Sequence, residues 1–263
     1  MPLTHSFVVV AHGQSPHLVD CLRSLAAQTR PSPVVISTST PFDGLSVIAS
    51  SFGASLHVHG PNRGIGRDWN EALDATDTDL VTLVHQDDLY SPSFAAQTLM
   101  AFSRNEKAVF AFCDSDEVWG DGSKRKFPFN HWVKQVMVSL ATWPGHQVRG
   151  RIKRRLLLGF GNPVICASVT LNRRQCRIFR FREDLRTNMD WIAWLQLSER
   201  KTVVRLKHCL LTRRVHMQSA TSQCISDGAR LTEDRLVFDS LWPSWLASLI
   251  LFFYRFSHSG YDS

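Results

Sequence analysis

The sequence predicts an α/β protein built on a doubly wound, mostly parallel sheet, with a helical extension at the C-terminal end. Two observations lead to this fold class. Over the first 115 residues, short runs rich in β-branched residues alternate with segments in which apolar residues recur at helical spacing. Most of the short runs are apolar throughout, which is typical of strands buried on both faces of a parallel sheet. The length of 263 residues and the hydrophobic fraction of 44% allow one large core.

Five strands are expected in this first part of the chain. They comprise residues 7–11, 34–36, 56–59, 80–84 and 109–112. Helices are expected between them, the first starting at Ser15–Pro16 and the others at residues 45–52, 68–73 and 94–102. Ser15 is expected to cap the first helix, because serine followed by proline is a common helix start.

The second half of the chain has a less regular pattern. Residues 117–160 are expected to form an insertion with a helix at 132–140, and residues 212–226 a polar loop. The other expected elements are strands at 164–171 and 202–211, a helix at 189–197, and mostly helix over 228–256. This last stretch is the helical extension.

The formal net charge of +7 arises largely from three basic clusters, at residues 124–126, 149–155 and 173–182. Such clusters attract nucleotide phosphates, lipid headgroups or nucleic acid, and the alternative is a solvated basic face. The sequence contains no zinc finger, helix-turn-helix signature or RNP-type aromatic motif beside them. Nucleic acid is therefore not expected as a partner.

The six cysteines and the two ends of the chain bear on its location. No C-x-x-C pair occurs, so buried thiols in a reducing compartment are expected. The first residues lack the pattern of a signal peptide, and a cytoplasmic location is expected. The apolar run at 245–253 is shorter than the roughly 20 residues of a membrane-spanning helix. It is either a buried helix or one that lies flat on the inner face of a membrane.

Ligands of parallel α/β sheets bind beyond the carboxyl ends of the strands. This rule selects four loops, at residues 11–13, 37–39, 60–66 and 85–88. The last of them reads His85-Gln86-Asp87-Asp88. Two adjacent carboxylates at the end of a buried strand repel each other, and a divalent cation such as Mg²⁺ or Mn²⁺ would offset this repulsion. The alternative is that the acidic pair caps the next helix, near Ser91–Pro92.

Four segments in order resemble family 2 glycosyltransferases. SFVVVAHGQSPHLVDCLRSLAAQT resembles the first strand and helix of that family, and NRGIGRDWNEALDATDTDLVTLVHQDD the run that ends in its Asp-x-Asp-Asp motif. GNPVICASVTLNRR is similar to its middle strand, and TNMDWIAWLQL to its acidic acceptor-site helix. Together they extend over roughly residues 6–220.

The resemblance implies a GT-A fold, which is a Rossmann-like α/β arrangement. It also implies a hexosyltransferase-type enzyme of polysaccharide biosynthesis, which moves a sugar with inversion from a nucleotide-sugar, most often a UDP-sugar. The implied acceptor is a saccharide or lipid-linked saccharide. In this interpretation residues 1–226 form the transferase domain, with a nucleotide-sugar half (1–115) and an acceptor half (116–226), and residues 227–263 form the extension.

Site residues follow from the resemblance position by position. Asp87 matches the metal-binding aspartate and Asp88 the acid beside it, whereas His85 replaces the first aspartate of the motif. Asp190 matches the catalytic base. His216 matches a histidine that such enzymes place near the diphosphate and the metal. The nucleotide-sugar is expected to contact Ala11, His12, Gly13, Ser37, Thr38, Asn62, Gly64, Arg67, His85 and Gln86.

One departure from the family and two other functions stay open. Ser37-Thr38-Ser39 stands where the family commonly has a base-binding aspartate, so the identity of the base is open. The other functions are a sugar-phosphate nucleotidyltransferase and a non-catalytic sugar- or nucleotide-binding module. A dehydrogenase is rejected, because Trp69 occupies the position of the third glycine of a dinucleotide fingerprint. Trp191 and Trp194 are expected in the core, with stacking on an acceptor sugar as the alternative.

Overall fold

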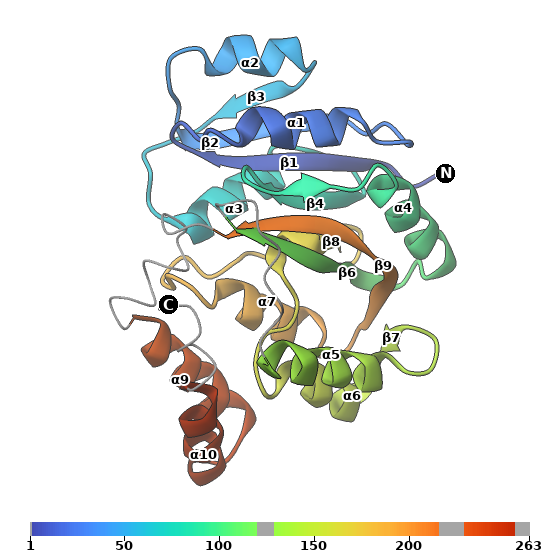
Figure 1. Ribbon diagram of the computed structural model, residues 1–263, viewed down its shortest axis with the longest axis vertical. Helices are drawn as coiled ribbons and strands as arrows, with labels where there is room; N and C mark the ends of the chain where they lie inside the picture. Colours follow the sequence, from blue (N-terminus) through green and yellow to red (C-terminus); the bar gives the residue numbers. More distant parts are fainter. Residues whose placement is uncertain (1, 120–128, 216–228, 256–263) are drawn as a thin grey trace.

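The computed structural model describes residues 2–119, 129–215 and 229–255. A nine-stranded sheet forms its centre, with strand order β3-β2-β1-β4-β8-β6-β9-β5 and β7 paired to β9 (Figure 1). The strands are β1 (His5–His12), β2 (Val34–Thr40), β3 (Ser55–Val58), β4 (Leu80–His85), β5 (Leu89–Tyr90), β6 (Ala108–Trp119), β7 (Gln147–Val148), β8 (Val169–Asn172) and β9 (Thr202–Val215).

The sheet is mostly parallel, as the continuous apolar strands predicted. Strands β3, β2, β1 and β4 run parallel, and so do β6 and β9. Strand β8 is inserted between β4 and β6 and is antiparallel to both. The carboxyl ends of β1, β2 and β4 therefore lie at one edge of the sheet, which is where the sequence placed the donor-binding loops.

Helices cover both faces of the sheet. They are α1 (Leu18–Ala26), α2 (Leu45–Ser51), α3 (Ile65–Asp74), α4 (Phe94–Arg104), α5 (Phe129–Thr142), α6 (Gly150–Leu158), α7 (Met189–Leu197), α9 (Ala229–Leu241) and α10 (Ser244–Arg255). Side chains of β1 alternate between two cores: Phe7 and Val9 pack with α1, α2 and α4, whereas Val8 packs with α3 and α7. This alternation is the signature of a sheet wound on both sides.

Two strands are longer than the sequence predicted. The expected strands ended at residues 112 and 211, but β6 continues to Trp119 and β9 to Val215. Residues 212–215, expected in a loop, therefore belong to β9. The reason is that polar side chains in the two extensions pair with each other across the strands, as Glu117 and Arg213 do. Neither extension shows the apolar pattern by which a buried strand is recognised.

The first helix and the strand at residues 164–171 also differ from expectation. Helix α1 begins at Leu18 with His17 as its N-cap residue, and the Ser15 hydroxyl group donates to Asp87 and accepts a hydrogen bond from the His17 N–H before the helix. In the second case a short 3₁₀ turn, η1 (Cys166–Ser168), precedes β8, which begins only at Val169. The insertion contains two helices, α5 and α6, where the sequence predicted one.

The extension packs against the rest of the protein through aromatic side chains. Phe238 of α9 and Tyr254 of α10 contact Trp191 of α7, with ring centroids 5.2 and 6.2 Å apart. The Trp242 indole donates a hydrogen bond of 2.7 Å to the carbonyl oxygen of Gly159. No helix in the described part of the chain has the length and apolar character needed to cross a membrane.

Candidate active site

The carboxyl ends of β1, β2 and β4 are joined by side-chain hydrogen bonds. The Gln86 amide accepts a hydrogen bond from the His12 N–H (3.3 Å) and donates one to the His12 carbonyl oxygen (3.0 Å). The Gly13 N–H donates to the Thr40 hydroxyl group at 2.8 Å. Three of the predicted donor-site residues thus lie together, and Thr40 joins them although the sequence did not select it for the site.

Asp87 lies half-buried at the end of β4, beside the loop after β1. Its carboxylate accepts a hydrogen bond of 2.6 Å from the Ser15 hydroxyl group. The first loop is therefore connected to the acidic motif by two contacts, through Gln86 and through Asp87. The interaction of Ser15 escaped the sequence analysis, because serine before proline also fits a helix cap.

Asp88 points the other way, into the protein, and is only 3% exposed. Its carboxylate accepts a hydrogen bond of 3.1 Å from the backbone N–H of Arg214 in β9. Burial raises the pKa of Asp88 to about 7, although the Arg213 guanidinium group and the Arg214 N–H act to lower it. The sequence led us to expect a cation that offsets the repulsion between the two carboxylates. Part of this positive charge comes from Arg213 in β9. Neither acid caps the next helix, which begins at Phe94 after Ser93.

Arg214 connects β9 to the first helix as well. Its guanidinium group lies 3.2 Å from the Asp20 carboxylate and 3.2 Å from Nδ1 of His17. Arg214 therefore brings the end of β9, the acidic motif and the start of α1 together. His216, the predicted metal-site histidine, lies outside the described residues.

His85 is held by an aromatic contact. Its ring stacks on Trp69 of α3, with centroids 5.8 Å apart and planes inclined by 27°. Its Nδ1 lies 3.9 Å from the Asp88 carboxylate. Burial lowers the pKa of His85 to about 4, so the ring is neutral at pH 7. Trp69, the residue that excludes a dinucleotide fingerprint, thus packs against the first residue of the acidic motif.

Five other predicted donor residues are either buried in β1 and β2 or part of the turn before α3. Ala11, Ser37 and Thr38 are almost fully buried, and the Thr38 hydroxyl group accepts a hydrogen bond from the backbone N–H of Thr40. The Asn62 side chain accepts a hydrogen bond of 3.0 Å from the Gly64 N–H in the turn before α3. In that turn Gly64 has a φ of 103°, a conformation that favours glycine.

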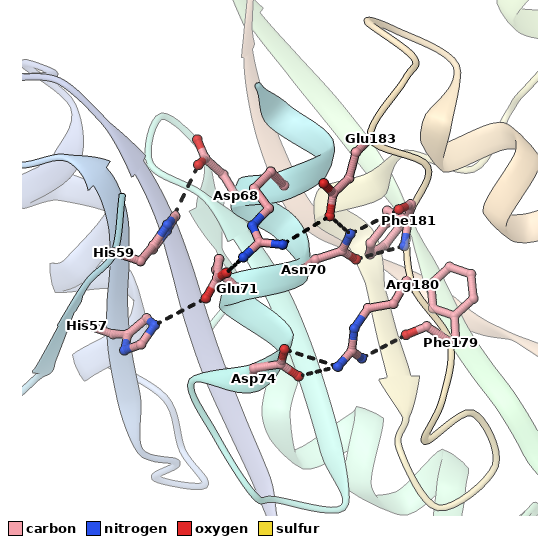
Figure 2. Close-up of polar contacts among 11 residues, drawn as sticks. His57, His59, Asp68, Asn70, Glu71, Asp74, Phe179, Arg180, Phe181 and Glu183 are labelled. Atoms are coloured by element: carbon pink, nitrogen blue, oxygen red, sulfur yellow. Dashed lines mark hydrogen bonds and ion pairs between the residues drawn. The ribbon is translucent and has the colours of Figure 1, made fainter. Parts of the chain in front are cut away.

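Arg67 belongs to a polar network along α3. Its guanidinium group is paired with Glu71 and lies 3.7 Å from Glu183. Figure 2 shows neighbouring contacts of the same network, including Asn70 with Glu183, His59 with Asp68, His57 with Glu71 and Asp74 with Arg180. The described contacts of Arg67 therefore attach α3 to the loop around residue 183, and none of them joins it to the strand-end residues.

Asp190 lies in the first turn of α7, half-buried. Its two carboxylate oxygens accept hydrogen bonds from the Trp191 N–H (2.6 Å) and from the Asn162 side chain (2.9 Å). Burial raises the pKa of Asp190 to about 6, against the opposing effects of the Trp191 N–H, the Arg230 charge and Asn162. A carboxylate in this range can accept a proton near neutral pH. Trp191 and Trp194 are both fully buried in the core, so neither is available to stack on a sugar.

The buried thiol of Cys166 shows that the two predicted centres are near each other. Burial raises the pKa of Cys166 well above its ordinary value, and the charges of Asp190 and Asp88 raise it further. Both carboxylates therefore lie within electrostatic range of one side chain at the start of β8. Four cysteines are buried as predicted, Cys209 is exposed, and Cys224 lies outside the described residues.

Comparison with known proteins agrees with this arrangement. The family model described as Glycosyl transferase family 2 matches residues 6–176. Among curated proteins, none matches the chain by sequence.

Solved structures with the same fold include two that contain a nucleotide-sugar. S. aureus TarS 1–349 in complex with UDP-GlcNAc superposes with a TM-score of 0.67 at 15% identity, over 95% of this chain and 70% of TarS 1–349. Mannosyltransferase PcManGT from Pyrobaculum calidifontis, in complex with GDP-Man and Mn²⁺, gives 0.62 at 14% identity, over 88% of this chain and 61% of its own. These similarities confirm the GT-A fold, and the family match over residues 6–176 shows that the chain belongs to glycosyl transferase family 2.

Proposed function

We propose that the protein transfers a sugar from a nucleotide-sugar, with a UDP-sugar as the first candidate, to a hydroxyl group of a saccharide or lipid-linked saccharide. Family membership supports glycosyl transfer in general. The observation that carries the specific proposal is the proximity of Asp88 and Asp190 to Cys166. It puts one carboxylate from each predicted centre, the acidic motif at the end of β4 and the start of α7, within electrostatic range of the same buried residue.

The strand-end residues would bind the donor. His12, Gly13 and Gln86 lie at the edge where ligands of such sheets bind, and their hydrogen bonds hold the loops at this edge in place. Asn62 and Gly64 form the next turn along that edge. Ser37 is buried, and its hydroxyl group has no hydrogen-bond partner within the described part of the chain. In our proposal the nucleotide lies over these loops with its diphosphate directed toward Asp87.

A divalent cation fits Asp87 only if the donor helps to hold it. Asp88 is buried against Arg214, and the described residues contain no group of three histidine, cysteine or acidic side chains placed to bind a metal. Mg²⁺ and Mn²⁺ are often held by one or two carboxylates together with substrate phosphates, and Asp87 supplies such a carboxylate. The mannosyltransferase neighbour was solved with Mn²⁺. A cation here would offset the charge that develops on the leaving diphosphate.

Asp190 would act as the general base. Its carboxylate accepts the proton of the acceptor hydroxyl group while that oxygen forms a bond to the anomeric carbon. The bond between the anomeric carbon and the diphosphate oxygen breaks in the same displacement, which inverts the configuration. Asn162 and the Trp191 N–H hold both carboxylate oxygens and thereby orient the base.

A membrane-associated acceptor is supported by the surface of α10. Trp245, Leu249, Phe252 and Phe253 are 71%, 48%, 56% and 63% exposed. They recur at the spacing of one helix face. Helix α6, whose Arg155 bonds to the Leu241 carbonyl oxygen at the end of α9 (3.1 Å), carries basic residues without an acid. An apolar helix face together with basic residues suits the surface of an anionic bilayer. We propose that the protein works on the cytoplasmic face of a membrane, in polysaccharide biosynthesis.

The proposed function is tested by a thermal-shift screen of UDP-, GDP- and dTDP-sugars with Mg²⁺ or Mn²⁺. A donor that binds the native protein at 100 times its Kd stabilises it by about 2.7 kcal/mol, which raises the melting temperature by several degrees. Asp87→Asn should remove most of the metal-dependent part of the shift. The matched control is Asp77→Asn, an exposed acidic residue in the loop before β4, at the opposite end of that strand from Asp87.

The products of turnover separate the alternative functions. Release of a nucleoside diphosphate with transfer of the sugar supports the proposal. Release of pyrophosphate from a nucleoside triphosphate would point to a nucleotidyltransferase. Metal-dependent binding without turnover would indicate a binding module, and no thermal shift with any nucleotide-sugar would contradict the donor site.

A further inference from the structure

We propose that α9 is a positioning element for catalysis, and that Glu233 and Asp234 fix the start of α7 and thereby the orientation of Asp190. This inference rests on the proposed role of Asp190 as the base. It assigns a function in the transferase site to the C-terminal extension, which the sequence analysis treated as a separate unit.

Glu233 is bonded to the segment directly before α7. Its carboxylate accepts hydrogen bonds from the backbone N–H groups of Arg186 (2.7 Å), Thr187 (2.9 Å) and Asn188 (2.8 Å). It also accepts one from the Thr187 hydroxyl group at 2.7 Å. One side chain thus binds three consecutive backbone donors that are 45 to 47 residues away in the sequence.

These contacts hold the three residues that lead into α7, up to its N-cap residue, and not the N–H groups of its first turn. The first N–H groups of a helix have no partner within the helix and are commonly satisfied by the side chain of the N-cap residue. In α7 the N-cap residue is Asn188, and its side chain makes no such bond. Its amide group instead donates to the carboxylate of fully buried Asp234, at 2.7 Å. Two acidic residues of α9 therefore hold the start of α7, where negative charge is favourable.

The hydrogen bonds that Glu233 accepts lower the pKa of its carboxyl group. Partial burial acts to raise its pKa, but the donors at Asn188, Arg186 and Thr187 lower it below the ordinary value. Glu233 is therefore ionised at neutral pH and can hold these donors as a charged acceptor.

Asp190 follows Asn188 by two residues and faces α9 and α10 as well as η1. The charged or titratable groups around it are Arg230 of α9, Tyr254 of α10 and Cys166 of η1. Arg230 lowers the pKa of Asp190, and it is itself bonded to Tyr254 and close to Asp234. The same helix thus contacts the backbone that carries the base and supplies a positive charge near it.

The test compares Glu233→Ala and Glu233→Gln with the control Asp239→Asn in the full chain. Asp239 lies on α9 too, but its carboxylate forms an exposed ion pair with Arg235 at 2.6 Å and does not touch α7. We expect Glu233→Ala to lower kcat by about 10- to 100-fold, because small displacements of a catalytic group have effects of this size. KM for the donor should change less than about twofold, and Glu233→Gln should recover part of kcat because its amide oxygen still accepts hydrogen bonds.

Two measurements do not depend on turnover. Hydrogen exchange at the amides of residues 186–188 should accelerate at least about tenfold in Glu233→Ala and stay unchanged in Asp239→Asn. The Asp190 carboxyl group, titrated by carbon-13 NMR, should change its pKa in Glu233→Ala, and in Arg230→Gln the pKa should rise because a nearby positive charge is lost. If the wild-type protein transfers no sugar, the proposed function fails, while these two measurements still decide whether α9 positions Asp190.

Unchanged exchange at residues 186–188 in Glu233→Ala would overturn the inference. An equal loss of kcat in Glu233→Ala and Asp239→Asn would overturn it too, because the effect would then be general destabilisation of α9. Since Glu233→Gln keeps the shape of the side chain, it provides the same comparison if the alanine variant does not fold.

Discussion

Asp190 combines burial with two fixed hydrogen bonds, and its acidity follows from their balance. Burial disfavours the charged carboxylate, and this effect prevails over the Trp191 N–H, Asn162 and Arg230, so the pKa lies at about 6. Asp87 and Asp88 illustrate the same point in adjacent residues. One carboxylate bonds to a hydroxyl group at the sheet edge, and the other is buried against the backbone of β9.

Asp190→Asn should abolish transfer while nucleotide-sugar binding, measured by thermal shift, stays near that of the wild type. The variant should also be more stable at pH 7. A raised pKa stabilises the fold below the unfolded-state value of about 4, and this contribution is lost as the pH rises through about 6. The amide has no charge to bury, so we expect a gain of about 1 kcal/mol, reduced by the hydrogen bond that is lost. Turnover equal to that of the wild type would remove Asp190 from the mechanism.

The same acidity sets the pH dependence of turnover. Because the base must be ionised, kcat should fall about tenfold per pH unit below a pH of about 6. The measurement is kcat at saturating donor and acceptor between about pH 4.5 and 8. A profile without this acid limb would contradict the assignment.

At the scale of elements, α3 is held close to the loop before α7. A Cβ atom added at Gly66 would lie 2.4 Å from the carbonyl oxygen of Arg182 and 3.0 Å from the Cα of Glu183. Two backbones thus approach each other where only glycine fits. This close contact supports the polar network that Figure 2 shows between α3 and the same loop.

Gly66→Ala should destabilise the protein by about 2 kcal/mol, measured by urea unfolding. In an exposed helix the same change would stabilise by up to about 1 kcal/mol, because alanine is the better helix former. Here the backbone contact reverses the sign, as overpacking commonly costs about 1–3 kcal/mol. The control is Gly60→Ala, where the new methyl group meets nothing within 4 Å. A stabilised Gly66→Ala variant would show that the loop moves away easily.

The strands and helices also show how much of the fold the local sequence pattern predicts. The apolar runs of β1, β2 and β4 placed the three proposed donor-binding loops at one edge, since such runs fix strands buried on both faces. The ends of β6 (residues 113–119) and β9 (residues 212–215) were missed because their polar residues satisfy each other, as Glu117 and Arg213 do at 3.3 Å. The start of α1 was misplaced because the partner of Ser15 is 72 residues away.

At the scale of the molecule, α10, which carries the exposed apolar side chains, lies at the end opposite to α2 (Figure 1). The proposed membrane contact predicts that the protein co-sediments with phosphatidylglycerol-containing vesicles. The double variant Phe252→Ser/Phe253→Ser should lower the bound fraction at least about fivefold, because it removes two exposed aromatic side chains from the interface. Salt at about 0.5 M should weaken the binding by screening the basic residues.

The control for this experiment is Val47→Ser on α2. Val47 is 71% exposed, like Trp245, but belongs to the far end of the molecule. Failure to bind anionic vesicles, or equal loss in the control variant, would contradict the membrane contact. A concentration-dependent dimer that the double variant abolishes would assign the face to a second copy of the chain instead.

The sequence by itself determined the fold class, the edge of the sheet where the carboxyl ends of the strands meet, and the acidic motif. These features depend on local periodicity and on residues close together in the chain. Only the tertiary structure decided which groups the carboxylates contact. Asp88 meets Arg214 across 126 residues, and Glu233 meets the start of α7 across 45 to 47. Such contacts arise from the packing of β9 and α9 against other elements, and nothing in the local pattern of either partner indicates them.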